Sequence, residues 1–317
     1  MSEANRWLQG SQKKSARLPF APSRAEKRLH GSKTFGGGRE LFGLTAMIAL
    51  LRKCFAFIRR DFQIESGYKV SFVTGALDSM MILVFFYFLS RLVTTQGAQY
   101  AARYGSNYLS FAVIGIALAR YFQLTLRMFS DSIRTAQMSG CLEAMLSSQT
   151  NSLTIVLLSS LYGLVSGAVQ PLLIFVAAAV FMGVDFSHAN VLSTVLILGF
   201  SIVIFVAFGV LSAATILWLK KGDPLAWVLG VMGTVLSGAY FPVDLLPVWL
   251  QKVSFLIPIT YSLDALRLTI LKGYSVAMIS GQTLILGLMA AVLLPLSLGI
   301  FAAMVRKGRI EGTLAQY

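Results

Sequence analysis

The stretch that decides the fold begins as Trp227-Val-Leu-Gly-Val-Met-Gly-Thr-Val-Leu-Ser-Gly-Ala-Tyr240 and continues as Phe241-Pro-Val-Asp-Leu-Leu-Pro247-Val-Trp-Leu250. Its first part has the apolar and small residues of a membrane helix, but it is shorter than the about 20 residues that cross a bilayer core. Pro242 and Pro247 then interrupt the helix, because proline lacks an N–H and disfavours helix at the residue before it. We therefore expect the chain to turn at the membrane surface and to dip back into the protein, where its backbone groups find partners.

Composition indicates an integral membrane protein. Of the 317 residues, 56% are hydrophobic and 13% are charged, and the mean hydropathy is +0.73. So few polar residues could not cover a water-soluble fold of this size. Residues 1–69 carry 14 Lys and Arg against 5 acidic residues. In a membrane protein this basic excess suits the anionic lipid of the inner leaflet, and we expect no nucleic-acid partner.

Two segments precede the membrane domain. Residues 1–40 are rich in basic and small residues without apolar periodicity, which predicts a disordered basic cytosolic tail. Residues 41–69 place apolar side chains at spacings of three and four, with Arg52, Lys53, Arg59 and Arg60 opposite them. This pattern predicts an amphipathic helix that lies on the inner leaflet, although a helix packed on a soluble partner would show the same pattern.

The rest of the chain, residues 70–317, is predicted to be an all-α transmembrane domain with six spans. The predicted spans cover residues 70–92, 109–128, 153–182, 191–219, 225–240 and 282–305. We expect kinks at Gln170-Pro171 and at Pro295. The two long links are residues 129–152 and 241–273. Lys220-Lys221, Arg306-Lys307 and the basic tail fall on one side, so both termini are expected in the cytosol and residues 241–273 outside.

Two charges lie inside predicted spans. Asp78 is eight residues from the inner end of the first span, and Arg120 is eight residues from the inner end of the second. At about 1.5 Å per residue both lie at about the same depth if the spans are antiparallel neighbours. An unpaired charge facing lipid is costly, so the sequence predicts an ion pair between them inside the bundle. Contact with a substrate in a polar pathway is the other possibility.

The segment after Tyr240 resembles the last third of ABC-2 type permeases, the membrane subunits of a class of ATP-driven exporters. The resemblance implies short external, re-entrant helices between the fifth and sixth spans that cap the pathway as an external gate. The residues that carry it are Phe241, Pro242, Leu246, Pro247, Trp249, Pro258, Thr260, Tyr261 and Arg267.

The predicted cytosolic link, residues 129–152, is expected to form a short helix with polar flanks. Its Gly140-Cys141-Leu142-Glu143 resembles the Gly-Thr-Leu-Glu motif of the ABC-2 coupling helix, with cysteine in place of threonine. The resemblance implies that this segment docks on the ATPase subunit and transmits its closure. An amphipathic helix that only covers the inner ends of the spans would look similar. The residues implied in coupling are Arg134, Gln137, Gly140, Cys141, Leu142 and Glu143.

These features indicate a membrane protein, and the resemblance implies the permease subunit of an exporter in a bacterial-type plasma membrane. The chain has no Walker A sequence, no nucleophile–base pattern and no metal-ligand cluster, so we expect it to be no enzyme and to bind no cofactor itself. By resemblance, ATP and Mg²⁺ bind a separate ABC ATPase subunit, a second permease copy completes the pathway, and the substrate is an amphiphilic drug, lipid or glycan. The alternative is a secondary transporter coupled to an ion gradient.

Overall fold

The computed structural model describes residues 69–92, 107–138, 152–219 and 223–310, which fall in one compact unit that begins at Arg52. All regular secondary structure in these ranges is helical, as the sequence predicts. The predicted basic tail and interfacial helix fall on residues outside them, apart from Lys69. The helices are α3 (Lys69–Leu92), α5 (Tyr108–Met138), α7 (Ser152–Gly167), α8 (Val169–Met182), α9 (Val191–Leu219), α10 (Pro224–Val235), the 3₁₀ turn η2 (Val243–Leu245), α11 (Val248–Ser254), α12 (Pro258–Leu271) and α13 (Ser280–Ile310).

Several of these helices are long and apolar enough to cross a bilayer, so the chain is a multi-pass integral membrane protein. Within the described ranges five qualify, namely α3, α5, α7 with α8, α9 and α13. α11 and α12 would qualify together as a sixth, but they are bent by 85° at their junction. This bend is compatible with the predicted re-entrant segment.

The span predicted over residues 225–240 is shorter than expected. α10 has 12 residues and ends at Val235, so at about 1.5 Å per residue it covers about 18 Å of a core about 30 Å thick. The chain then turns through Gly238, whose φ of 81° lies in the left-handed region that glycine adopts most easily. The small residues that suggested a continued helix instead form this turn.

The second long helix also departs from the prediction. α5 continues to Met138, so residues 129–138 are its last turns and not part of a separate short helix. The extension is stabilised by packing, because Phe129 and Ile133 are buried against α9 residues such as Val210. Residues 139–151 of the predicted coupling segment lie outside the described ranges.

The prolines act differently in the two helices predicted to kink. The break between α7 and α8 falls at Ala168, just before Pro171. A proline removes the hydrogen bond to the carbonyl four residues earlier, here Gly167, and its ring clashes with that carbonyl, so α7 ends at Gly167. Pro295, in contrast, lies inside α13, which continues through it.

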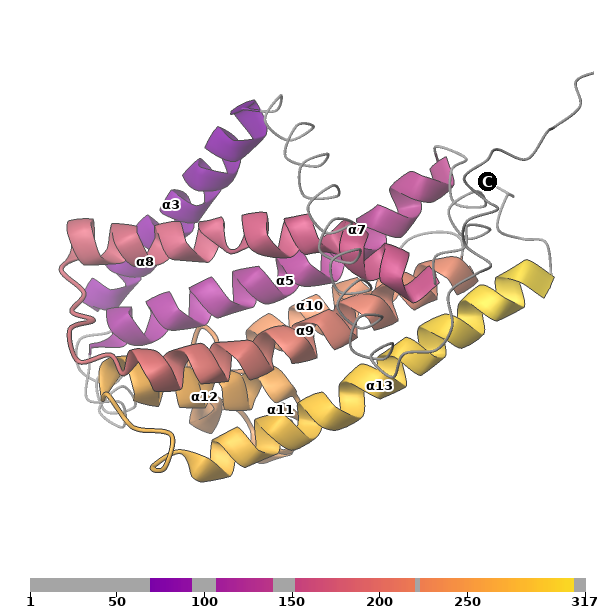
Figure 1. The fold of residues 1–317 in the computed structure, drawn as a ribbon. Helices are drawn as coiled ribbons and strands as arrows, with labels where there is room; N and C mark the ends of the chain where they lie inside the picture. The colour runs from indigo at the N-terminus through magenta and orange to yellow at the C-terminus, as the bar shows by residue number, and fades with distance from the viewer. Residues whose placement is uncertain (1–68, 93–106, 139–151, 220–222, 311–317) are drawn as a thin grey trace, which may run out of the picture. The chain divides into compact units, whose positions relative to one another are not determined.

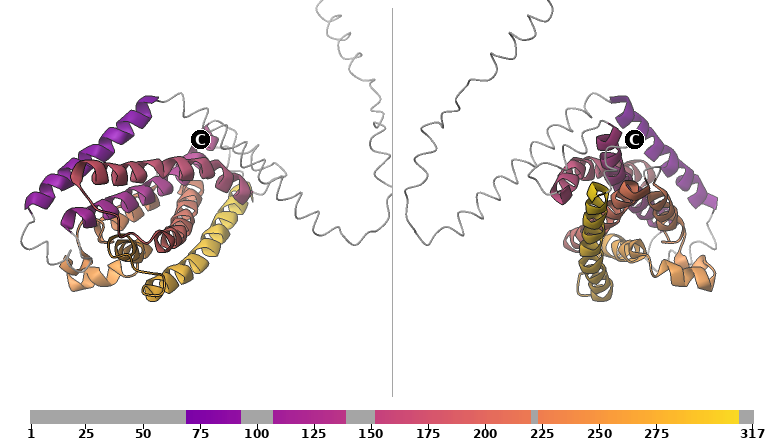
Figure 2. Two further views of the ribbon diagram at one scale, coloured as in Figure 1. Left: turned by 60° about the vertical axis from the view of Figure 1, so that its left-hand side comes forward. Right: turned by 90° about the vertical axis from the view of Figure 1, so that its right-hand side faces the viewer.

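α5 and α9 form the centre of the bundle. In Figure 1 they lie side by side, with α8 and α3 beyond α5, and with α12 and α13 beyond α9. The turned views in Figure 2 keep α3 and α13 on opposite sides. In the most apolar 18-residue stretch of each candidate span, 72% of the residues are buried in α5, 39% in α9 and 17–22% in the others. Among the candidate spans, α5 therefore leaves the smallest share of its residues for lipid.

The helices begin and end at two opposite ends of the bundle. At one end, called here the α12 end, α5, α9 and α13 begin, and α12 lies against them. At the other, called the Met138 end, α5 and α9 stop, α10 begins and α13 ends. The descriptions below use these two names.

One close backbone contact at the α12 end requires glycine. A Cβ added at Gly115 of α5 would lie 1.8 Å from the carbonyl oxygen of Ala239, in the turn after α10. Real side-chain atoms do not approach a backbone oxygen so closely, so any larger residue must push the turn away from α5.

We predict that Gly115→Ala destabilises the fold by about 1–3 kcal/mol or more, the usual range for overpacking. Thermal unfolding in detergent, followed by size-exclusion chromatography, measures this. Gly199→Ala on α9 is the matched control, because a Cβ there meets nothing within 4 Å, and alanine is the better helix former. Equal midpoints for the two variants would contradict the close contact.

Candidate functional site

A buried arginine joins three segments at the α12 end. Arg267 on α12 is 3% exposed. Its Nε and Nη2 donate to the carbonyl of Phe111 on α5 at 3.3 and 3.2 Å. Nη2 also donates to the carbonyls of Gly238 and Ala239 at 2.9 and 3.2 Å. The guanidinium carbon lies 3.3 Å from the centroid of the Phe111 ring. One planar cation therefore ties α12 to α5 and to the turn after α10.

The turn after α10 needs such a donor. The carbonyls of Gly238 and Ala239 lie beyond the end of α10, so the helix does not pair them, and buried backbone carbonyls need a donor. Further bonds hold the same segment. The Tyr108 hydroxyl donates to the Tyr240 carbonyl at 2.9 Å, and the Ser254 hydroxyl donates to the Leu236 carbonyl. The Thr260 hydroxyl donates to the Ser254 carbonyl at 2.8 Å and so links α11 to α12.

The residues of the predicted external gate differ in burial. Pro258, Thr260 and Arg267 are buried in α12, Phe241, Pro242, Leu246 and Tyr261 are partly buried, and Pro247 and Trp249 are exposed. Pro258 stands in the first turn of α12, where its missing N–H costs nothing. The buried members thus have structural roles, and gating by the set remains a prediction.

A cavity of about 350 Å³ with several polar side chains in its lining lies beside these residues, where α12 faces the start of α13. Gln282 Nε2 donates to Asp264 Oδ2 at 3.2 Å across this junction. The polar side chains in its lining are Ser237, Asp244, Thr260, Tyr261, Asp264, Arg267 and Gln282. The cavity shows that polar side chains gather at the α12 end.

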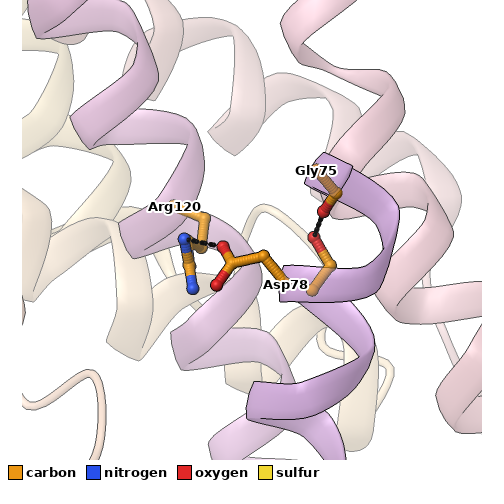
Figure 3. Close-up of polar contacts among 4 residues, drawn as sticks. Gly75, Asp78 and Arg120 are labelled. Carbon is orange, nitrogen blue, oxygen red and sulfur yellow. Dashed lines mark hydrogen bonds and ion pairs between the residues drawn. The ribbon is translucent and has the colours of Figure 1, made fainter. Parts of the chain in front are cut away.

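The structure brings the two predicted intramembrane charges together. Arg120 Nη1 on α5 lies 2.6 Å from Asp78 Oδ2 on α3, as Figure 3 shows. The hydroxyl of Ser79 donates to the carbonyl of Gly75 one turn earlier at 2.9 Å. The Asp78 side chain is 60% exposed and that of Arg120 is 27% exposed. The pair therefore lies at the surface of this chain and not inside the bundle, because α3 covers only part of α5.

The residues predicted for coupling divide at the end of α5. Arg134 and Gln137 lie on its last turns, at the Met138 end, and Arg134 is exposed. The Oε1 atom of Gln137 is buried and accepts no hydrogen bond from the described residues. Gly140, Cys141, Leu142 and Glu143 lie outside the described ranges.

A carboxylate that the sequence analysis missed fixes the start of α10. Asp223 Oδ1 accepts from the Ala226 N–H at 2.9 Å, and Oδ2 accepts from the hydroxyls of Ser130 on α5 and Ser212 on α9. Asp223 thereby caps α10 and ties it to both central helices. The signal was present, since Asp223-Pro224 before an apolar run is typical of a helix N-cap followed by proline at the first position.

Metal coordination finds no support in the ranges that the structure covers. Within them, no group of three or more His, Cys, Asp or Glu side chains could hold a metal ion. The polar groups described above serve hydrogen bonds and ion pairs instead.

Comparison with known proteins adds one finding. The family model described as ABC-2 type transporter matches residues 52–271, which is more than half of the chain and ends with α12. A search of curated proteins found no match.

We predict that Arg267→Lys lowers the free energy of unfolding by about 2–4 kcal/mol. Lysine keeps the charge but lacks the planar fork, so buried carbonyls lose their donors at about 1–3 kcal/mol each. The measurement is again the thermal midpoint in detergent. Arg91→Lys on α3 is the control, since Arg91 is exposed and its one described hydrogen bond goes to the Tyr87 hydroxyl. If the two midpoints fall equally, Arg267 does not hold these segments together.

We also predict that Asp78→Ala and Arg120→Ala each reduce the yield of folded protein in the membrane several-fold, because each leaves a charge unpaired where charges are costly. The exchange of both residues, Asp78→Arg with Arg120→Asp, should restore most of the yield. Fluorescence-detected chromatography of a tagged chain reports it. An exchange no better than the single variants would show that the pair does more than neutralise charge.

Proposed function

This chain belongs to the ABC-2 type transporter family, and from that premise we propose that it is the membrane-spanning permease subunit of an ATP-driven exporter. The observation that carries the proposal is the family match over residues 52–271, a range that contains four of the five candidate spans of the described residues. The family match favours this function over the ion-coupled transporter. We propose an amphiphilic substrate of the drug, lipid or glycan class.

The energy would come from a separate ABC ATPase subunit, which binds ATP and Mg²⁺. The permease itself would catalyse no reaction. We propose that residues 129–152 contact this ATPase through Arg134, Gln137 and the segment Gly140–Glu143. The Met138 end and both termini would then lie in the cytosol, and the α12 end outside.

The continuity of α5 supports such coupling. α5 is one unbroken helix from Tyr108 to Met138, about 45 Å long at 1.5 Å per residue. Near one end it carries Phe111, whose carbonyl binds Arg267, and near the other it carries Arg134 and Gln137. Force applied at the cytosolic end would therefore reach the turn after α10 and α12 through a single rigid element.

A second permease copy would complete the pathway. Asp78 is exposed on α3 at the depth of the spans, a costly position against lipid. Trp227 on α10 and Trp249 on α11 are also exposed on the surface of the chain. A partner copy or a water-filled pathway between two copies would keep Asp78 away from lipid.

We predict that the chain copurifies with an ATPase, encoded for example in a neighbouring reading frame, when the two are expressed together. Leu142→Ala with Glu143→Ala should reduce the recovered ATPase by about tenfold or more, if these side chains form the core of the contact. The readout is the ratio of ATPase to permease after affinity purification. Asp185→Ala in the loop at the α12 end is the control and should leave the ratio unchanged. Transport by the purified permease without an ATPase would contradict the proposal.

A further inference from the structure

Three arginines recur at intervals of seven residues along α5, namely Arg120, Arg127 and Arg134. Seven residues make almost two full helical turns, with a difference of about 20°, so the three side chains project from nearly the same face of the helix. Consecutive arginines are about 10 Å apart along the helix axis. Charges are rare in membrane helices because they are costly, and those that persist usually mark a functional path. This row extends from the Asp78–Arg120 pair to the Met138 end.

A cavity of about 300 Å³ lies between this row and α10. Arg127 and Arg134 line it from α5, with Asp131 between them, and Trp227 lines it from α10. Its volume is at the lower end of small-molecule sites, which suits a headgroup better than a whole lipid or drug.

Arg127 and Arg134, nearer the Met138 end, have N–H groups available for a ligand, whereas Arg120 is bound to a carboxylate. Arg120 is paired with Asp78 at 2.6 Å. Arg127 and Arg134 are exposed, and the described residues give them an electrostatic interaction with Asp131 but no hydrogen bond. Asp223, also in the lining, already accepts from Ala226, Ser130 and Ser212. Asp131, which lies between these two arginines on α5, offsets part of their positive charge.

The chemistry of the lining selects an anion with an apolar part. A guanidinium presents planar, parallel N–H groups that match the oxygens of phosphate, so two of them two turns apart can converge on one phosphate ester. On the α10 side, Trp227 is 71% exposed and Val231 is 43% exposed. A charged head could thus rest on α5 while an apolar tail follows α10.

We propose that this α5–α10 pocket binds the phosphate group of an anionic amphiphile, and that such amphiphiles are the substrate class of the transporter. The inference rests on the proposed permease function, because the pocket opens at the end of the bundle to which the ATPase is assigned. Arg127 and Arg134 bind the phosphate. Asp131 holds the two arginines in position when no ligand is bound, and Trp227 contacts the apolar chain of the ligand. The Asp78–Arg120 pair provides the next polar contact along α5.

The test is binding to the purified full chain, measured by native mass spectrometry from neutral detergent. The probes are dioctanoyl phosphatidic acid, dioctanoyl phosphatidylcholine and inorganic phosphate. Phosphatidic acid should bind saturably and at least about tenfold more tightly than phosphatidylcholine. Arg127→Gln and Arg134→Gln should each weaken it by about 10- to 100-fold, as expected for a lost hydrogen bond to a charged group.

Arg306→Gln is the matched control, since Arg306 is an exposed arginine near the end of α13 and does not line this pocket. It removes the same charge and should change the affinity by less than about twofold, because a general attraction to anionic lipid would respond to any arginine at that end. Arg127→Lys keeps the charge without the fork and should give an intermediate loss. If Arg127→Gln does not fold, the pair Arg127→Lys and Arg306→Lys makes the same comparison.

Each other outcome overturns the inference. Equal affinity for phosphatidic acid and for phosphatidylcholine, whose phosphodiester is balanced by a quaternary ammonium, would remove the role of a net-anionic phosphate. Equal losses in Arg127→Gln and Arg306→Gln would reduce the pocket to surface electrostatics. Inorganic phosphate that binds as tightly as phosphatidic acid would show a soluble anion as the ligand. Because no ATPase is present in this assay, none of these results bears on the permease function, which is tested separately by copurification.

Discussion

In a membrane, backbone polar groups that leave a helix must find partners inside the protein, and this constraint shapes the whole α12 end. The chain leaves the helix after α10 and exposes the carbonyls of Gly238 and Ala239. Arg267 satisfies both from α12 and reaches the Phe111 carbonyl on α5 with the same guanidinium. The absence of a side chain at Gly115 lets the turn come close enough for this arrangement. A short helix, a bend and a buried cation thus depend on one another.

α5 connects this end to the other. It is the most buried of the candidate spans and continues without a break to Met138. At the Met138 end a second anchor holds α10, where Asp223 accepts hydroxyl groups from both α5 and α9. α10 is therefore fixed to α5 at its start and, through Arg267, just beyond its end. A displacement of α5 would be expected to carry α10 and the turn with it.

Several charged groups of the described membrane helices lie along one face of α5. The Asp78–Arg120 pair, Arg127, Asp131 and Arg134 follow one another there. The opposite, apolar faces of α3, α8 and α13 carry exposed side chains such as Phe85, Phe181 and Leu288, which suit lipid. Such a division of polar and apolar surface is what a permease needs if a charged headgroup is to move beside the protein while its apolar tail stays in a hydrophobic environment.

The sequence by itself determined the membrane class, the all-helical architecture, the bounds of α9 and, within one residue, those of α3, because these follow from the length of apolar runs. It also predicted the partner of Asp78, since equal depth in antiparallel helices follows from counting residues. Only the tertiary structure decided where α5 and α10 end, because packing of Phe129 and Ile133 against α9 extended one helix and the turn at Gly238 shortened the other. It also decided that Arg267 is a buried anchor and that Asp223, besides capping α10, is bonded to α5 and α9. These contacts depend on carbonyls and hydroxyls from distant segments, which no local pattern specifies.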